Sequence, residues 1–165
     1  MRAIVQRGFG SPDALAVEEI DRLVPGEGEV LVAVRAASLN PLDWHMLRGT
    51  PRIIRLSAGF GRNRVMRVGR DVAGVVEAIG AKAGRLRAGD AVFGACQGAF
   101  SDYVCGAESA FVAKPAALSF EAAAAIPVAG LTALQGLRDK GRLRPGQRLL
   151  VNGAAGGVAG EPVAG

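Results

Sequence analysis

The sequence predicts a mainly β unit, a barrel or sandwich of short strands, followed by a helical stretch, a strand and a glycine-rich loop. Up to residue 113 the chain shows short β-branched runs that Gly and Pro interrupt at regular intervals. From Ser119 onward alanine replaces valine, and leucines recur at helical spacing. An apolar run at 148–151 then leads directly into glycines. The change in composition divides the chain into residues 1–118 and 119–165.

The first unit is expected to contain several short strands and one helix. The strands are predicted at residues 3–5, 15–17, 29–36, 71–80, 89–94 and 99–104. The pair Asn40-Pro41 signals a helix start, with Asn40 as N-cap and proline in the first turn. The helix should end near Gly49, because glycine adopts the left-handed conformation of a helix C-terminus without strain.

Composition and charge favour a globular protein and disfavour two classes of partner. Hydrophobic residues make up 50% of the chain and charged residues 21%, and the net charge is +5. Seven arginines and no acid lie between Arg48 and Arg70, whereas acids and bases alternate elsewhere. That segment has no interleaved aromatics to stack on bases, so we interpret it as a solvated loop and expect no nucleic-acid binding. The longest uncharged stretch, 122–137, is shorter than the ~20 residues of a membrane span, and the N-terminus resembles no signal peptide. We therefore expect a cytoplasmic protein with no membrane partner.

The spacing Gly153-x-x-Gly156-x-x-Ala159 after a strand matches a dinucleotide-binding fingerprint. Glycines there let the backbone approach a pyrophosphate, which the next helix N-terminus stabilises. A plain glycine-rich turn is the alternative interpretation in a chain so rich in glycine. Residues 160–165 contain two glycines and a proline where an apolar helix should begin. We therefore expect an incomplete cofactor site, such as a truncated or frame-shifted gene would encode.

The ordered set of motifs resembles the zinc-free quinone-oxidoreductase and alcohol-dehydrogenase-like branch of the medium-chain dehydrogenase/reductase superfamily. Its members combine a GroES-like barrel with a Rossmann domain, and the resemblance covers nearly the whole chain. The blocks that carry it lie at residues 37–44, 69–76, 89–94, 98–104, 129–133 and 151–158. The resemblance implies a GroES-like unit at 1–118 and the truncated start of a Rossmann NAD(P)-binding domain at 119–165.

The resemblance also implies cofactor-binding residues. Asn40 would lie near the nicotinamide and Thr132 would contact the cofactor. The pyrophosphate would face the backbone of Gly153, Ala154, Ala155, Gly156, Gly157 and Val158. A helix cap at Asn40 and an ordinary helical position at Thr132 remain the structural alternatives. The implied cofactor is NADPH, with NADH left open.

Two aromatic residues, Trp44 and Phe60, are candidates to border the substrate pocket, although core packing is the interpretation that their residue types favour. His45 has no partner in the sequence to support a proton relay, so an exposed or hydrogen-bonded imidazole is favoured. No catalytic acid or base is assigned.

Zinc is not expected. Zinc-dependent relatives carry a cysteine and a histidine-glutamate pair at positions where this chain has Asn40 and Arg70-Asp71. Cys96 and Cys105 cannot supply a four-cysteine structural site, and we interpret both as buried thiols.

The resulting prediction is the N-terminal part of an NADPH-dependent oxidoreductase that transfers hydride to a quinone, an enone or another carbonyl, inactive as this fragment. Its partner would be a small-molecule substrate, and full-length relatives would be homo-oligomers. A non-catalytic GroES-like module that binds a partner through its basic loop is the alternative, and a truncated product without function is a third.

Overall fold

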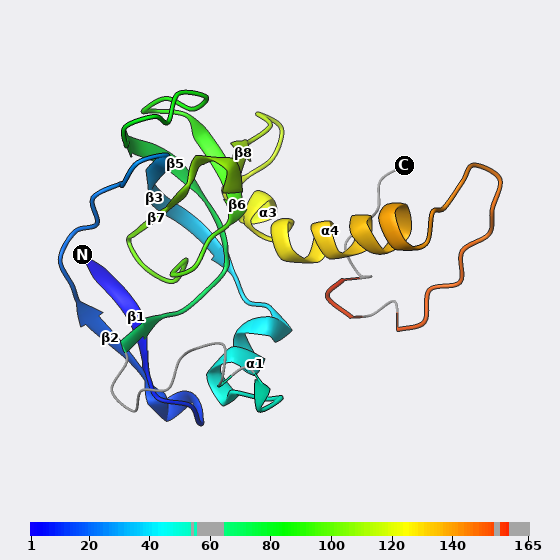
Figure 1. Cartoon of the computed structure of the whole chain (residues 1–165), viewed down its shortest axis with the longest axis horizontal. Coiled ribbons are helices and arrows are strands. Elements are labelled where there is room, and N and C mark those ends of the chain that lie inside the picture. The colour runs from blue at the N-terminus through cyan, green and yellow to red at the C-terminus, as the bar shows by residue number, and fades with distance from the viewer. Residues whose placement is uncertain (54, 56–64, 154–155, 159–165) are drawn as a thin grey trace.

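The computed structural model describes residues 1–53, 55, 65–153 and 156–158, and its strands form two antiparallel sheets (Figure 1). The strands are β1 (Arg2–Arg7), β2 (Leu15–Glu19), β3 (Glu29–Ser38), β4 (Val65–Arg67), β5 (Asp71–Ile79), β6 (Ala91–Ala95), β7 (Tyr103–Ala107) and β8 (Phe111–Ala113). One sheet has the order β2-β1-β4, and the other has the order β7-β3-β5-β6-β8. Single 3-10 turns lie at Pro12–Ala14 and Glu108–Ala110. The mainly β character of the first unit is therefore confirmed.

The core lies on the five-stranded sheet, where β3 and β5 pair along most of their length from Val30–Ile79 to Ser38–Asp71. Their alternating valines enter one cluster with apolar residues from the neighbouring strands and loops. The cluster consists of Val30, Val32, Val72, Val76, Leu86, Val92, Ala99, Val104 and Phe111. Burial of these side chains is the main favourable contribution to the stability of the unit.

The predicted barrel or sandwich needs a correction, because among the described residues the two sheets do not close into a barrel. Only an isolated bridge between Ala3 and Ser101 and flanking backbone bonds, such as Ile4 N–H to the Phe100 carbonyl at 2.8 Å, join them. The edge of β1 that carries the Ala3–Ser101 bridge is paired with β4 from Val5 onward. Few residues of that edge remain to form a continuous hydrogen-bonded ladder between the two sheets.

The predicted helix at Asn40-Pro41 is present as α1 (Pro41–Arg48). Asn40 occupies the N-cap position, and its backbone N–H donates to the Asp43 carboxylate at 2.8 Å. Gly49 ends the helix with a φ of 60°, in the left-handed region that favours glycine. Both ends of this helix were therefore predictable from local sequence.

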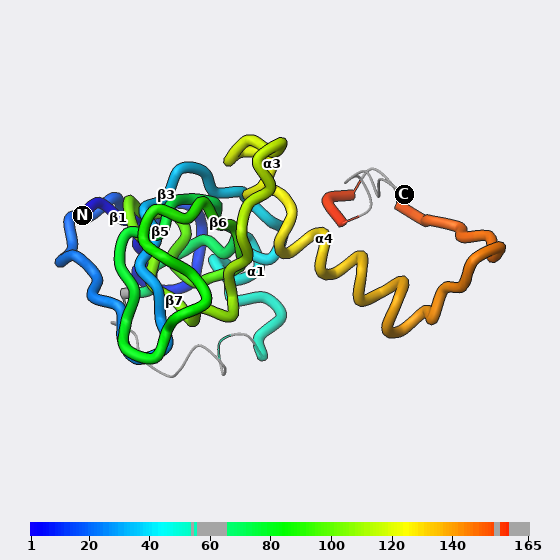
Figure 2. The backbone as a smooth tube through the Cα atoms, turned by 90° about the horizontal axis from the view of Figure 1, so that it is seen from above, coloured from blue at the N-terminus to red at the C-terminus, as the bar shows by residue number. Residues whose placement is uncertain are grey.

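The alanine-rich stretch is helical, as expected. It forms α3 (Phe120–Ala124) and α4 (Pro127–Leu134), and a π-helical turn follows at Gln135–Lys140. Ala123 and Ala124 pack on Ala73 of β5, where small side chains allow the helix to approach the sheet closely. α4 then points away from the sheets (Figures 1 and 2). None of the described helices has the length and apolar character needed to cross a bilayer.

The predicted strand Arg148–Val151 is wrong. These residues are exposed and belong to no strand, and Leu150 retains 93% of its accessible surface. Among the described residues, the hydrogen bonds of segment 143–158 stay within that segment or reach back to Leu137, so none of them pairs it with a described strand. The start of a Rossmann sheet is thus not formed in the described part of the chain.

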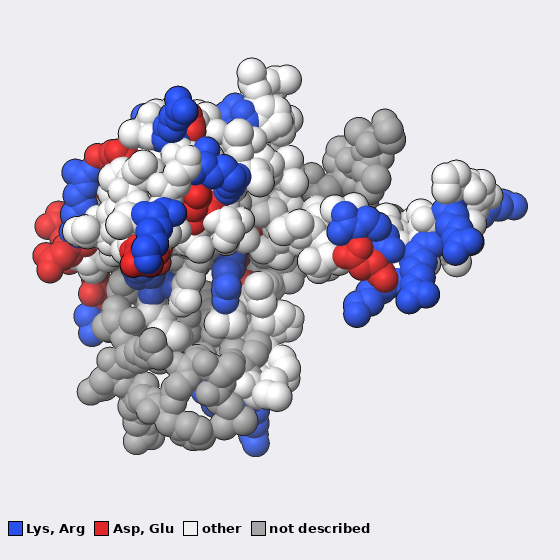
Figure 3. Space-filling model, turned by 45° about the horizontal axis from the view of Figure 1, so that its top comes forward, with Lys and Arg blue, Asp and Glu red and all other residues white. Residues whose placement is uncertain are grey.

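The segment beyond α4 is also strongly basic, which the expected alternation of acids and bases did not anticipate. Figure 3 shows its basic side chains gathered on the arm that projects from the sheets. They are Arg138, Lys140, Arg142, Arg144 and Arg148, all exposed.

Candidate functional site

A buried carboxylate lies where the five-stranded sheet meets two helices. Asp71, the first residue of β5, is fully buried. Its Oδ2 accepts hydrogen bonds from the side-chain amide of Asn40 at 3.0 Å and from the Ser38 hydroxyl at 3.4 Å. The backbone N–H of Val128, in the first turn of α4, lies 3.1 Å from both carboxylate oxygens. Asp71 therefore joins the end of β3, the start of α1 and the start of α4.

Thr132 lies one turn further along α4. Its hydroxyl donates to the backbone carbonyl of Val128 at 2.6 Å, a bond internal to the helix, and the residue is exposed. Asp71 therefore joins Asn40, one residue predicted to bind cofactor, to the first turn of the helix that carries the other, Thr132.

Burial raises the pKa of Asp71 above 3.8, and the neighbouring negative charge of Asp43 raises it further. Hydrogen bonds from Val128, Asn40 and Ser38 oppose this shift but do not cancel it. Because the pKa in the folded state lies above the unfolded value, this carboxyl stabilises the fold most below pH 3.8. That contribution is lost as the pH rises through the raised pKa.

We expect a carbon-13 NMR titration of the Asp71 carboxyl carbon to give a pKa above 3.8. Asp139 is the internal control, because its exposed carboxylate pairs with Arg138, which holds its pKa below the usual value. An Asp71 pKa at or below that of Asp139 would contradict the dominance of burial at this junction.

The described part of the predicted glycine loop does not reach this junction. Gly153, Gly156, Gly157 and Val158 are exposed, while Ala154 and Ala155 lie outside the described residues. Gly153 has a φ of 78°, and its carbonyl accepts from the Gly156 N–H at 2.9 Å. A Cβ built on Gly153 meets nothing within 4 Å, so the turn leaves its backbone open to a ligand.

The aromatic candidates do not form a pocket with Asn40 in the described residues. Trp44 is 50% exposed, so the core packing that its residue type favoured is wrong. Its ring instead contacts His45 edge-on, with the Arg48 guanidinium 4.8 Å from its centroid. His45 is exposed, as expected, and Phe60 lies outside the described residues.

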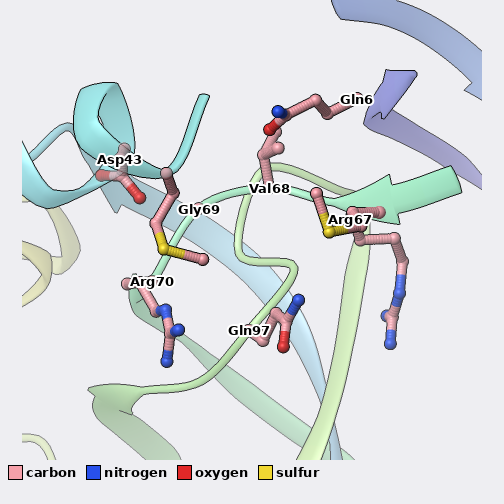
Figure 4. A pocket seen from close by; sticks show the side chains of 9 residues that line it. Gln6, Asp43, Arg67, Val68, Gly69, Arg70 and Gln97 are labelled. Carbon is pink, nitrogen blue, oxygen red and sulfur yellow. The ribbon is translucent and has the colours of Figure 1, made fainter. Parts of the chain in front are cut away.

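A small pocket lies beside the junction, between α1, the end of β4 and the turn at residue 97 (Figure 4). Its volume is about 30 Å³. Asp43 lines it, and so do Arg67, Arg70 and Gln97. Because Asp43 also accepts from the Asn40 N–H, the pocket and the Asp71 junction share the first turn of α1.

Among the described residues no three His, Cys, Asp or Glu side chains gather as metal ligands. Of the residues Asn40, Arg70 and Asp71, on which the expectation of no zinc rested, Asn40 and Asp71 are hydrogen-bonded to each other. Cys96 and Cys105 are free thiols and only half-buried, so the expected full burial needs correction. The thiol of Cys96 lies 3.3 Å from the Cys105 carbonyl, which accounts for its packing without a metal.

Cys105 is expected to be unreactive in the folded protein. Burial and the adjacent Glu29 carboxylate, which accepts from the thiol at 3.5 Å, raise the pKa of Cys105 to about 11. At pH 8 its thiolate fraction should fall about 100-fold below that in the unfolded chain. Iodoacetamide labelling followed by mass spectrometry, with and without urea, measures the difference. Glu29→Gln should accelerate labelling of the native protein, and equal rates in both states would refute the expectation.

Comparisons with known proteins identify the family of the chain. The family model for the alcohol dehydrogenase GroES-like domain matches residues 26–118, more than half of the chain. The chain therefore belongs to the alcohol dehydrogenase GroES-like domain family. Its relatives include quinone oxidoreductases, which confirms the resemblance to the medium-chain dehydrogenase/reductase superfamily.

Three relatives illustrate the extent of the similarity. Quinone oxidoreductase of Lama guanicoe is 34% identical over 165 residues, covering 96% of this chain and 47% of that protein. Quinone oxidoreductase of Escherichia coli, solved in complex with NADPH, has a TM-score of 0.83 at 30% identity, covering 96% of this chain and 47% of that one. CurK enoyl reductase has a TM-score of 0.87 at 28% identity, covering 96% and 48%. The chain spans about half the length of the curated relatives it matches.

From the sequence, Asp71 stood out only as a position where a zinc ligand is missing. One local signal was available, since a single acid opens the otherwise apolar run Asp71–Val76. A carboxylate at the start of a buried strand requires hydrogen-bond donors. Which donors it finds depends on α4, 57 residues further along the chain.

Proposed function

We propose that this chain is the N-terminal, GroES-like part of an NADPH-dependent oxidoreductase that transfers hydride to a quinone, an enone or another carbonyl compound. The observation that carries the proposal is the Asp71 junction, which fixes the side-chain amide of Asn40 beside the first turn of α4. NADPH supplies the hydride, and the protein supplies orientation and a desolvated site. The names of the relatives, two quinone oxidoreductases and an enoyl reductase, support this substrate class.

The roles of individual residues are part of the proposal. Asn40 borders the nicotinamide, and Thr132 contacts the cofactor from α4. The open turn at 153–158 faces the pyrophosphate, and Trp44 and Phe60 border the substrate. Residues 1–118 form the GroES-like unit and residues 119–165 the start of the nucleotide-binding part. The complex of the Escherichia coli relative with NADPH supports that cofactor over NADH.

Cofactor binding by the 165-residue chain alone should be weak. Residues 148–151 are exposed and unpaired with any described strand, so the strand and the glycine turn do not present a rigid phosphate site. Calorimetric titration with NADPH tests this, and we expect a dissociation constant of about 1 mM or higher, at or beyond the upper end of typical KM values. Micromolar binding by this chain would contradict the proposed weakness of the site.

Zinc should play no part. Asn40 and Asp71 bond to each other and to backbone donors, and they leave no set of three ligands among the described residues. Elemental analysis after dialysis against a weak chelator should give well under one zinc per chain. Stoichiometric zinc would overturn the assignment to the zinc-free branch.

A further inference from the structure

The half-buried side chain of Lys114 makes three contacts in the connection between β8 and α3. The backbone N–H of Lys114 donates to the Ala91 carbonyl at 2.8 Å and so continues the pairing of β8 with β6. Its ammonium group donates to the backbone carbonyls of Pro115, at 3.1 Å, and of Leu118. The same ammonium lies 5.0 Å from the ring centroid of Phe120, the first residue of α3. One residue therefore links the edge of the sheet to the first turn of α3.

A positively charged group is suited to this position. An ammonium offers three hydrogen-bond donors and no acceptor, and both of its hydrogen-bond partners here are carbonyl oxygens. The face of the Phe120 ring attracts a cation as well. Within the described part of the chain, no carboxylate forms an ion pair with Lys114. A neutral apolar side chain would leave the two carbonyls without this donor and remove the attraction to the ring.

The apolar contacts that hold α3 to the sheet are small. Ala123 and Ala124 pack on Ala73 of β5. Because an alanine side chain buries little apolar area, this contact stabilises the position of the helix only modestly. Polar contacts lie on both sides of it, those of Lys114 before α3 and those of the Asp71 junction in the first turn of α4 (Figure 1). The position of α3 and α4 therefore depends on two polar contacts.

We propose that Lys114 is a positioning residue that, together with Asp71, fixes the direction of α3 and α4 relative to the five-stranded sheet. In the proposed function Thr132 of α4 contacts the cofactor, and Asn40 approaches it from the end of β3. Lys114 then sets how these two residues face each other without touching the cofactor itself. Only this consequence rests on the proposed function, because the fixing of α4 is a property of the 165-residue chain.

The test is hydrogen exchange, followed by proton–nitrogen NMR, in the 165-residue chain with Lys114→Met. Methionine keeps most of the length of the side chain and removes the ammonium. We expect exchange at the Val128 N–H, which donates to Asp71, to accelerate at least about tenfold, while exchange in β3 and β5 is unchanged. Residual dipolar couplings of the α4 amides should shrink relative to those of β3 and β5, because α4 would sample several directions.

Two control variants separate the role of the ammonium from a general effect of substitution. Lys114→Arg keeps a positive charge and several donors, so it should restore most of the protection at Val128. Lys82→Met removes an exposed ammonium that pairs with Glu27 and should leave exchange at Val128 unchanged. The amide signals of β3 and β5 establish that each variant is folded. If Lys114→Met does not fold, Lys114→Gln, which is neutral and retains an N–H donor, takes its place in the same comparison.

Unchanged exchange at Val128 in the folded neutral variant would overturn the proposal. Equal acceleration in α4, β3 and β5 would overturn it as well, since Lys114 would then contribute only to global stability. Failure of Lys114→Arg to restore protection would refute the role of the positive charge. NADPH is absent from these measurements, so failure of the proposed oxidoreductase function would leave their outcome unaffected.

Discussion

Replacing Gly94 with alanine is expected to lower the free energy of unfolding by about 3 kcal/mol or more, as overpacking of a rigid site does. Gly94 lies in β6 opposite Phe111 of β8. A Cβ on Gly94 would collide with the backbone carbonyl oxygen of Ala110, which a rotamer change cannot move. Relief would require β8 to separate from β6 and would displace Phe111, the largest fully buried side chain of the core.

Urea denaturation of the variant measures this loss. Gly84→Ala is the matched control, because a Cβ there meets nothing within 4 Å and the backbone has no positive φ. That control should change the free energy of unfolding by at most about 0.5 kcal/mol, as surface substitutions usually do. Equal effects of the two substitutions would mean that β6 and β8 are not packed as described.

Replacing Asp71 with alanine is expected to cost about 2–4 kcal/mol, because it leaves several donors at a buried junction without an acceptor. The orphaned groups would be the Asn40 amide, the Ser38 hydroxyl and the Val128 N–H. Asp71→Asn retains one acceptor oxygen and should cost less. The loss should be accompanied by faster hydrogen exchange at Val128 and by a change in the side-chain amide signals of Asn40.

The control for this series is Asp139→Ala. Asp139 is exposed and pairs only with the adjacent Arg138, so its removal should have little effect on stability. If Asp71→Ala unfolds no more easily than Asp139→Ala, or leaves exchange at Val128 unchanged, then Asp71 does not hold α4 to the sheet.

Local sequence was sufficient for those parts of the fold that depend on local chemistry. The pair Asn40-Pro41 and Gly49 defined both ends of α1, because capping is decided within one turn. The valine-rich runs predicted β3 and β5 for a similar reason, since burial of one face specifies a strand.

Other features depend on partners that the sequence does not specify. The run Arg148–Val151 is apolar enough for a buried strand, yet a strand forms only where another strand offers its backbone groups. The predicted closed barrel was wrong for a similar reason, because the second edge of β1 pairs with β4. The Asp71 junction and the pocket of Arg67 and Arg70 arise from contacts between elements distant in the chain.

In the proposed function, the Asp71 junction positions Asn40 for hydride transfer. The most direct test is a chimera that joins residues 1–134 of this chain to the C-terminal remainder of the quinone oxidoreductase of Lama guanicoe. We expect the chimera to bind NADPH and to reduce a quinone or an enone. Asn40→Ala and Asp71→Asn should each lower turnover at least about tenfold while NADPH binding persists, and the control Gly84→Ala should not. A folded chimera that binds NADPH but reduces neither substrate, or that is indifferent to Asn40→Ala, would contradict the account and favour a non-catalytic partner-binding module.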